Sequence, residues 1–272
     1  MTPSSLLTPT LSSFSLRDKV CVVTGAARGL GLEFCRAFLD AGCTSLVLVD
    51  LKDADLKDAI AELKRDLSGL KETLNILALE CNVTDEASVK VAFAKTVETF
   101  GSVDVVVASA GIVENYSALD YPADSAKLLY DVNVQGVFLT AREGARFMIP
   151  NGAGSIILIG SMSANIVNIP QPQTPYNASK AAVKHMAASL AVEWAKHGIR
   201  VNCLSPGYML TKLTRTILEG NPELKETWEK LTPMGRMGNP EDLRGAIVFM
   251  ASDASRFMTG TEIRIDGGYT CI

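Results

Sequence analysis

Short apolar runs alternate with longer amphipathic stretches along almost the whole chain of 272 residues. Most of the runs are rich in Val, Ile or Leu and lack polar alternation, which is typical of parallel strands that are buried on both faces. Seven runs are predicted to be strands: Lys19–Thr24, Ser45–Asp50, Asn75–Glu80, Val103–Ala108, Ser155–Gly160, Ile199–Leu204 and Glu262–Ile265.

The stretches between the runs repeat apolar residues every three or four positions, and this spacing predicts helices. The expected helices are Gly29–Ala41, Asp53–Leu67, one that opens at Thr84, Ser125–Met148, Thr174–His197 and Pro240–Ser252. Regular alternation of strands and helices predicts an α/β fold with a doubly wound parallel sheet and helices on both faces. Because no repeat or linker divides the chain, residues 17–272 are expected to form one domain.

Composition supports a globular protein, because a hydrophobic content of 47% is enough for a large core. Residues 1–16 are rich in Ser, Thr and Pro and are predicted to be a flexible segment. They lack the arginines of a transit peptide and the unbroken apolar run of a signal peptide. No window approaches the roughly 18 apolar residues of a membrane span. A cytoplasmic protein without membrane contact is therefore expected.

The charge and the cysteines argue against two classes of site. A net charge of −4 and a pI of about 5.4 disfavour nucleic-acid binding, which needs a positive surface. The six cysteines include no CxxC pair, and most of them lie in apolar segments. Buried thiols are therefore expected rather than disulfides or a metal site.

The segment from residue 208 to residue 236 interrupts the strand–helix rhythm with several glycines and prolines and contains Trp228. It follows a predicted strand at the edge of the sheet where ligands bind, and such an insertion is often a substrate lid. A peripheral pair of packed helices is the alternative.

The sequence TGAARGLG, from Thr24 to Gly31, lies between the first predicted strand and the first predicted helix. Glycines at this point permit a tight turn and let the backbone approach a pyrophosphate, while the helix N-terminus offers free N–H groups. The position between a strand and a helix favours a dinucleotide site over an ordinary loop. Its expected ligands are Gly25, Arg28, Gly29, Leu30 and Gly31.

Asp50 ends the second predicted strand, 19 residues after Gly31. A carboxylate there can accept both ribose hydroxyls of NAD and repels the 2′-phosphate of NADP, whereas Arg28 can pair with that phosphate. NAD is therefore the favoured cofactor and NADP the alternative. Asp50 can also be a solvated acid at a strand end that binds no cofactor. The residues after the third and fourth predicted strands either reach the cofactor as well or form ordinary turns. They are Asn82 and Val83 after the third strand, and Ser109, Ala110 and Gly111 after the fourth.

Tyr176 and Lys180 are four residues apart on a predicted helix and so share one face. A neighbouring ammonium favours the phenolate and lowers the tyrosine pKa from its ordinary value near 10. Such a pair can exchange a proton with an alcohol or a carbonyl oxygen, although many pairs with this spacing are surface contacts. Ser161, at a strand end, can hydrogen-bond a developing oxyanion. Asn133, a poor helix former in mid-helix, can hold a water that relays protons.

Several features follow one another along the chain in this order: TGAARGLG, SAG, Asn133, Ser161, YNASK and SPGYMLT. On these features, the sequence from Leu16 to the C-terminus resembles the short-chain dehydrogenase/reductase superfamily. The resemblance implies a Rossmann-type seven-stranded sheet and a catalytic tetrad of Asn133, Ser161, Tyr176 and Lys180. It also implies that Lys180 binds the nicotinamide ribose. Further cofactor contacts are implied after the sixth strand, at Pro206, Gly207, Met209 and Thr211.

Some features depart from the usual pattern of that superfamily. Ser109 stands where the fourth-strand motif usually has Asn, and Asn82 stands where an acid is often found. Ser161 lies 15 residues before Tyr176, whereas Ser163 has the commoner spacing of 13. The extra length comes from a stretch similar to the N-x-P-Q-x-Q segment of fungal polyol and ketose reductases, such as the D-arabinitol, mannitol and sorbose enzymes. In that group the first serine of the S-M-S run is the catalytic one, which favours Ser161.

The resemblance implies an NAD(P)-dependent oxidoreductase that transfers a hydride between the cofactor and a secondary alcohol/ketone pair, such as D-arabinitol and a ketopentose. A carbonyl reductase for a less polar ketone and a non-catalytic binding protein on the same fold are the alternatives. The polar candidates for contacts to a sugar are Glu114, Asn115, Tyr116, Asn165, Asn168, Gln171 and Gln173. An apolar pocket would use Met209, Leu213, Ile217 and Trp228.

A homotetramer is expected from two helices. Ser125–Met148 and Thr174–His197 carry more apolar residues than one buried face needs. Members of the superfamily pack these helices across one two-fold axis and the C-terminal segment, here Asp266–Ile272, across another, and closed symmetry suits such self-complementary surfaces.

Overall fold

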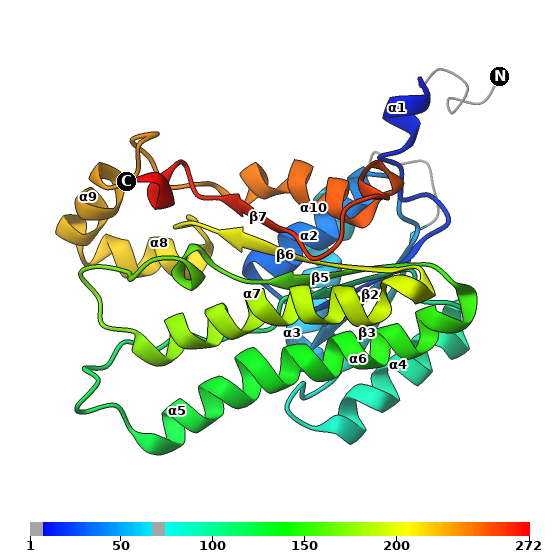
Figure 1. Cartoon of the computed structure of the whole chain (residues 1–272), viewed down its shortest axis with the longest axis horizontal. Helices are drawn as coiled ribbons and strands as arrows, with labels where there is room; N and C mark the ends of the chain where they lie inside the picture. Colours follow the sequence, from blue (N-terminus) through cyan, green and yellow to red (C-terminus); the bar gives the residue numbers. More distant parts are fainter. Residues whose placement is uncertain (1–7, 67–73) are drawn as a thin grey trace.

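The computed structural model describes residues 8–66 and 74–272, apart from the side chain of Leu213. Seven parallel strands form one sheet in the order β3-β2-β1-β4-β5-β6-β7 (Figure 1). This topology confirms the predicted doubly wound sheet, with the strand order reversing between β1 and β4. The strands are β1 (Val20–Thr24), β2 (Ser45–Asp50), β3 (Asn75–Glu80), β4 (Val105–Ala108), β5 (Gly154–Ile159), β6 (Ile199–Pro206) and β7 (Glu262–Ile265).

Helices cover both faces of the sheet (Figure 1). One face packs against α2 (Gly29–Asp40), α3 (Asp53–Asp66) and α10 (Arg244–Ala251). The other face packs against α4 (Glu86–Phe100), α6 (Val137–Met148) and α7 (Thr174–Trp194). Neighbouring strand residues serve different faces: Val23 of β1 joins the first core and Val22 joins the second. A strand buried on both sides has no polar face, which explains the unbroken apolar runs of the sequence.

An ion network joins the three helices on the first face. Glu33 of α2 is only 5% exposed, and its carboxylate binds Arg36 at 2.5 Å and also Arg244 of α10. Arg36 continues the network to Glu62 and Asp66 of α3, each at 2.8 Å. Because a carboxylate buried this deeply must be paired, the network fixes how α2 lies against its neighbours.

Several helices differ from the sequence predictions. The helix predicted over 125–148 is α5 (Ala123–Tyr130) and α6 joined by a π-helical turn, η2 (Asp131–Gly136). The helix predicted over 240–252 begins as a 3₁₀ turn, η6 (Pro240–Leu243), before α10. The helix predicted to open at Thr84 is α4, which begins at Glu86. The side chain of Asp85 caps it by accepting a hydrogen bond from the N–H of Ala87. Leu67, the predicted end of the second helix, lies outside the described residues.

The segment expected to be flexible has structure from residue 8 onward. A short helix, α1, spans Pro9–Ser12, and the carbonyl of Ser13 accepts a hydrogen bond of 3.0 Å from the N–H of Ala254. Leu16 is fully buried, and the Phe14 ring lies 6.1 Å from the Phe249 ring of α10. Apolar side chains among the Ser and Pro residues thus anchor this part of the segment, and its flexibility stays a prediction.

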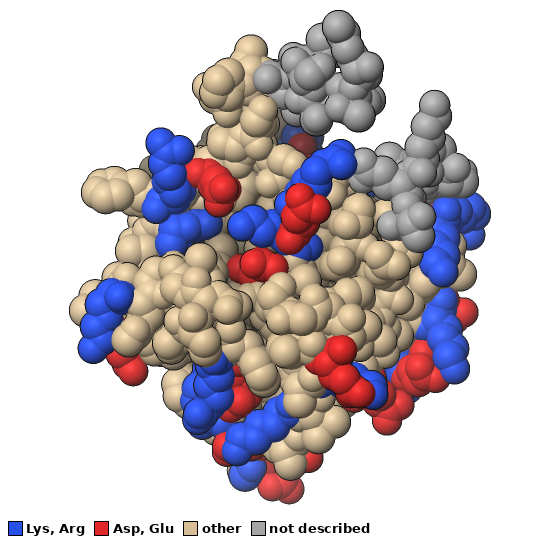
Figure 2. Space-filling model, turned by 90° about the vertical axis from the view of Figure 1, so that its right-hand side faces the viewer, with Lys and Arg blue, Asp and Glu red and all other residues tan. Residues whose placement is uncertain are grey.

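The carboxyl ends of the strands point toward α8 (Lys212–Glu219) and α9 (Pro222–Lys230), which lie together at one end of the molecule (Figure 1). This is the edge where open α/β sheets bind ligands. The face opposite these two helices carries Lys and Arg interspersed with Asp and Glu (Figure 2). In the described parts of the chain, no helix is both long and apolar enough to cross a membrane.

Candidate active site

The glycine loop after β1 is packed too closely for side chains. A β-carbon at Gly25, where φ is +67°, would lie 2.8 Å from the Cα of Ala110. A β-carbon at Gly31 would lie 2.1 Å from the carbonyl oxygen of Gly25. Gly29 has a φ of +59°, and no described atom would lie within 4 Å of a β-carbon there, so its far side is open. The loop therefore leaves room beside the start of α2.

The start of α2 offers unpaired backbone donors to that space. Arg28 occupies the position before the first helical residue, and no described side chain caps the helix. The first intrahelical donor in the loop is Leu32, whose N–H reaches the Arg28 carbonyl at 3.4 Å. Free N–H groups at a helix start attract anions, so Gly29, Leu30 and Gly31 form a cradle that fits a pyrophosphate.

Asp50 faces the glycine loop. Its Oδ2 accepts a hydrogen bond of 2.9 Å from the N–H of Ala27, and its Oδ1 accepts one of 2.8 Å from the N–H of Leu51. The side chains of Arg28, next to Ala27, and of Lys52, next to Leu51, are exposed to solvent. The carboxylate is thus held beside the cradle by backbone donors, and each oxygen keeps a lone pair for another donor.

The ends of β3 and β4 close the cradle. Oδ1 of Asn82 accepts from the N–H and hydroxyl of Thr84, at 3.1 and 2.9 Å, so only its amide nitrogen is left for an adenine. Val83 is buried against Gly136, where a β-carbon would lie 2.8 Å from Val83 Cγ2.

Ser109, Ala110 and Gly111 follow β4 and lie on the glycine loop. The N–H groups of Ser109 and Ala110 point to the hydroxyl oxygen of Thr24, at 3.2 and 3.4 Å. A β-carbon at Gly111 would lie 3.3 Å from Oδ1 of Asn133 and 3.6 Å from Nζ of Lys180. Gly111 therefore joins the cofactor cradle to the predicted catalytic residues.

Asn133 lies in the π-helical turn and is fully buried. Its Oδ1 accepts from the N–H of Ile112 at 2.8 Å, and its Nδ2 donates to the Ile112 carbonyl at 2.9 Å and to the Ser179 hydroxyl at 3.1 Å. Ser179 in turn donates to the Tyr176 carbonyl at 2.7 Å. Asn133 thus anchors α7 to the loop after β4, and only one Oδ1 lone pair remains for the predicted water. Ser179 was not among the predicted site residues, although it lies inside the YNASK motif.

Tyr176 and Lys180 share one face of α7, as predicted. Nζ of Lys180 lies 5.6 Å from the centre of the Tyr176 ring and donates to the Ile159 carbonyl at 2.9 Å. Burial lowers the pKa of Lys180 to about 8. Burial also raises the pKa of Tyr176, against a hydrogen bond with Ser161 that lowers it. The expectation that Lys180 lowers the tyrosine pKa is therefore not met in this structure, where desolvation dominates.

Ser161, rather than Ser163, contacts the tyrosine. Ser161 follows β5, bonds Tyr176 and accepts from the N–H of Ser163 at 3.1 Å. Ser163 follows Ser161 in the chain of hydrogen bonds that starts at Tyr176, and its hydroxyl oxygen is 2.9 Å from that of Ser161. The choice of Ser161 as the residue next to the reacting oxygen stays a prediction.

The segment after β6 reaches the same edge. A β-carbon at Gly207 would lie 2.7 Å from the Cα of Asp266, so this turn packs on the end of β7 beside Pro206. Met209 is buried with its sulfur against Gly238, and the Thr211 hydroxyl caps α8 by accepting from the N–H of Thr214 at 3.3 Å. Both side chains have structural partners, and their predicted contacts to a carboxamide stay predictions.

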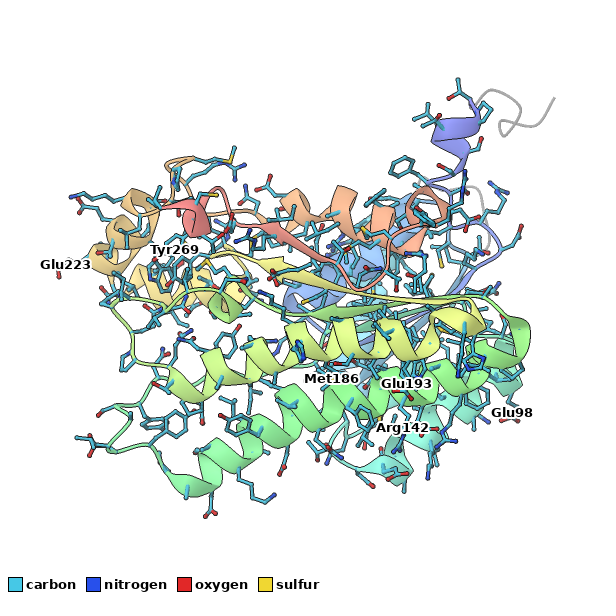
Figure 3. The ribbon with its side chains drawn as sticks, in the orientation of Figure 1. Glu98, Arg142, Met186, Glu193, Glu223 and Tyr269 are labelled. Carbon is cyan, nitrogen blue, oxygen red and sulfur yellow. The ribbon has the colours of Figure 1, made fainter. Side chains whose placement is uncertain are left out.

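The two helices of the expected lid have an apolar cluster of their own. Leu218 of α8, Trp228 of α9 and Met237 are buried together, apart from the cores on the two faces of the sheet. Tyr208 stacks on Trp228 with ring centres 4.0 Å apart and meets Tyr269 of η8 (Tyr269–Cys271) edge-on at 5.3 Å. Tyr269, labelled in Figure 3, lies at the end of the molecule that carries α8 and α9. Tyr208 was not among the predicted site residues.

Several side chains proposed to bind a sugar are bonded within the protein. Asn168 and Gln173 are buried, and Nε2 of Gln173 donates to Oδ1 of Asn168 at 2.9 Å. Nδ2 of Asn165 donates to Glu262 at 2.7 Å. In the part of the chain that the structure describes, no three His, Cys, Asp or Glu side chains form a group that could hold a metal ion.

Comparison with known proteins defines the class. The family model described as Enoyl-(Acyl carrier protein) reductase matches residues 25–270. A crystal structure of a short-chain type dehydrogenase/reductase from Mycobacterium marinum superposes with a TM-score of 0.88 at 39% identity, covering 97% of this chain and 100% of that one. The chain belongs to the short-chain dehydrogenase/reductase family and is an oxidoreductase that uses a nicotinamide cofactor.

Particular relatives act on sugar alcohols and ketoses. A D-arabinitol 2-dehydrogenase [ribulose-forming] from Candida tropicalis is 42% identical over 268 residues, with 95% of each chain covered. A galactitol 2-dehydrogenase (L-tagatose-forming) from Cereibacter sphaeroides is 42% identical over 257 residues, covering 94% of this chain and 97% of the relative.

Proposed function

We propose that the chain interconverts a polyol and a ketose, such as D-arabinitol and a ketopentose, with Tyr176 as the proton-transferring residue. The observation that carries the proposal is the convergence of Tyr176, Ser161 and Lys180 at the carboxyl end of β5, directly beside Gly111 and the cradle. The names of the relatives above support the substrate class.

The residues around the cradle fit a nicotinamide dinucleotide, which supplies the acceptor or donor of the hydride when bound. The proposed ligands are Gly25, Arg28, Gly29, Leu30, Gly31, Asp50, Asn82, Val83, Ser109, Ala110, Gly111, Asn133, Tyr176, Lys180, Pro206, Gly207, Met209 and Thr211.

The chain's own part in the reaction is to hold the substrate oxygen and move its proton. In alcohol oxidation, the Tyr176 phenolate takes the hydroxyl proton as the carbon loses its hydride; in ketone reduction, the phenol returns it. The Ser161 hydroxyl donates to the same oxygen while charge develops on it. Because the pKa of Lys180 is lowered only to about 8, its ammonium is the main form at pH 7.

We infer a preference for NAD over NADP from Asp50. The bond from the Ala27 N–H turns the carboxylate toward the cradle, where it can accept ribose hydroxyls and would repel a 2′-phosphate. The relatives include both a probable NADP-dependent mannitol dehydrogenase and an NADH-dependent L-xylulose reductase.

A carbonyl reductase for a less polar ketone is the second candidate. Leu119, Val167 and Ile169 are exposed in the segments that follow β4 and β5, while the amides of Asn168 and Gln173 are bonded internally. Oxidation and reduction rates over polyols, ketoses and aryl ketones, followed by nicotinamide absorbance, decide between the two. The proposal predicts the highest kcat/KM for a polyol or ketose, and a clear preference for aryl ketones would reject it.

We also propose a homotetramer. Fewer apolar residues of the two helices are available for a subunit interface than the sequence indicated, because Leu129, Val137 and Val183 are buried within the chain itself. Leu128 of α5 and Val192 of α7 remain 53% and 84% exposed, and both belong to the two helices predicted to pack across a two-fold axis.

A further inference from the structure

We propose that Asn168 is a positioning residue that acts through Ser163 to orient the hydroxyl of Ser161. The inference rests on the proposed function, since it gives Ser161 the task of donating to the substrate oxygen. All three side chains are buried, with exposed fractions of 8% for Ser161, 5% for Ser163 and 4% for Asn168.

The three groups form one hydrogen-bonded chain. The hydroxyl of Ser163 donates to Oδ1 of Asn168 at 2.5 Å, and the hydroxyl of Ser161 donates to Oγ of Ser163 at 2.9 Å. An amide oxygen accepts and cannot donate, so the proton between Ser163 and Asn168 must come from Ser163. Ser163 has no second proton to give, and it can therefore only accept from Ser161.

The amide of Asn168 is fixed in this orientation from both sides. Its Oδ1 also accepts from Nε2 of Gln173 at 2.9 Å, and its Nδ2 donates to the Tyr208 hydroxyl at 3.1 Å. A flipped amide would turn the nitrogen toward two donors, the Ser163 hydroxyl and the Gln173 nitrogen. The surroundings thus specify which end of Asn168 meets Ser163.

Tyr208 ties this chain to α9. Nε2 of Gln171 also donates to the Tyr208 hydroxyl, at 2.9 Å, and Nε1 of Trp228 donates to Oε1 of Gln171 at 3.2 Å. The rings of Tyr208 and Trp228 are stacked at 9° between planes. Asn168 therefore lies between the catalytic serine and the aromatic stack that holds α9.

The chain of hydrogen bonds therefore gives the hydroxyl proton of Ser161 one defined direction before substrate binds. Its Oγ accepts from the N–H of Ser163, and its proton points to Oγ of Ser163. A single rotation about the C–O bond turns that proton to Tyr176 or to a substrate oxygen. Without Asn168, Ser163 is free to donate to Ser161 instead, and the Ser161 hydroxyl loses this orientation.

The test is a double-mutant cycle of Asn168→Ala and Ser163→Ala, on the full-length protein with its best substrate from the screen above. Each single variant should lower kcat about tenfold with little change in KM, because about 1.4 kcal/mol is one net hydrogen bond. The double variant should lose no more than either single variant, since both break the same chain.

A second readout separates positioning from mere stability. The intact chain holds the Ser161 proton on Ser163, and a hydrogen bond from Ser161 to the phenolate lowers the pKa of Tyr176. Both single variants free the Ser161 hydroxyl for that bond, so both should shift the pH profile of alcohol oxidation to lower pH. Asn151→Ala is the control, because the Asn151 amide donates to the carbonyl of Phe147 in α6 and has no assigned part in the site. It should keep the native profile and kcat, and all variants should bind NADH with the native Kd.

Additive losses in the cycle, or a native kcat and pH profile in Ser163→Ala, would overturn the inference. Ser163→Ala removes one hydroxyl only, so it decides the matter even if Asn168→Ala does not fold. An inactive native protein in the whole screen would instead reject the proposed function.

Discussion

The ammonium of Lys180 lies 5.6 Å from the centre of the Tyr176 ring, one turn further along α7. At this distance the cation does not offset the burial of the phenol, and the pKa of Tyr176 is raised. The tyrosine therefore rests as a neutral donor, which suits ketone reduction at neutral pH. Alcohol oxidation needs the phenolate and should be faster at higher pH.

Tyr176→Phe should abolish most of the activity, because the ring remains and only the proton-transferring hydroxyl is lost. We expect a fall in kcat of at least about 100-fold, the low end for general acid–base catalysis. Steady-state kinetics measures the loss, and circular dichroism should show an unchanged fold. Near-native turnover in this variant would remove Tyr176 from its role.

Lys180→Met should change stability in a pH-dependent way. Burial lowers the pKa of Lys180 from 10.5 to about 8, so the folded protein holds this proton less tightly than the unfolded chain does. The cost, about 3 kcal/mol at 1.36 kcal/mol per pKa unit, is full below pH 8 and fades toward pH 10.5.

Urea unfolding of both proteins between pH 7 and pH 10.5 measures this effect. The stability of Lys180→Met relative to the parent should be greatest near pH 7 and should decline as pH rises. The lost bond to the Ile159 carbonyl adds only an offset that is the same at every pH. A stability difference that stays constant over this range contradicts the prediction.

Asp50→Ala should erase the cofactor preference. Charge-assisted bonds to ribose hydroxyls contribute about 1.5–3 kcal/mol each, so the native protein should prefer NAD by about 10- to 1,000-fold in kcat/KM. The variant should use both cofactors with similar efficiency. Arg28→Ala is the opposing control and should weaken NADP more than NAD. A native preference for NADP would show that Asp50 does not govern the choice.

Glu33→Gln should destabilise the fold without touching the active site. The substitution leaves Arg36, which is only 14% exposed, and Arg244 without their shared carboxylate. Arg36 keeps Glu62 and Asp66 and Arg244 keeps Asp40, so we expect a loss below the about 3–5 kcal/mol of a buried charge that is left without any partner. Glu62→Gln, at the 43% exposed end of the same network, should cost less than about 1 kcal/mol. Equal urea midpoints for the two variants would exclude a special role for the buried carboxylate.

Light scattering should give four times the 29.1 kDa mass of one chain. Val192→Glu places a charge on the exposed position of α7 and should reduce the mass to that of a smaller species. Val91→Glu, equally apolar but on α4, is the control and should leave the assembly intact. A native mass of 29.1 kDa at micromolar concentration would end the tetramer proposal.

The sequence predicted most of the sheet because its strands are buried on both faces. The bounds of β2 and β3 agree at both ends with the apolar runs Ser45–Asp50 and Asn75–Glu80. The catalytic pair was equally visible, since residues i and i+4 share a helix face whatever lies around them. Such features depend on local spacing alone.

Features that depend on distant partners were not visible. The π-helical turn at Asn133 goes with side-chain bonds to Ile112 and Ser179, which are 21 and 46 residues away. The burial of Tyr176 outweighs the neighbouring charge, and spacing says nothing of desolvation. Asn168 carries the same amide whether it meets a sugar or Ser163, so only the folded chain distinguishes the two.

The small cluster of Leu218, Trp228 and Met237 has a consequence for how this chain can diverge. Because the cluster is separate from the cores on both faces of the sheet, α8 and α9 can open or be replaced at the expense of a few buried contacts. Substitutions at Leu218 leave the glycine cradle and the Tyr176–Lys180 pair untouched, whereas Trp228 has to be kept, because its bond to Gln171 leads through Tyr208 to Asn168. Descendants of this chain can thus acquire new substrates while inheriting the hydride chemistry unchanged.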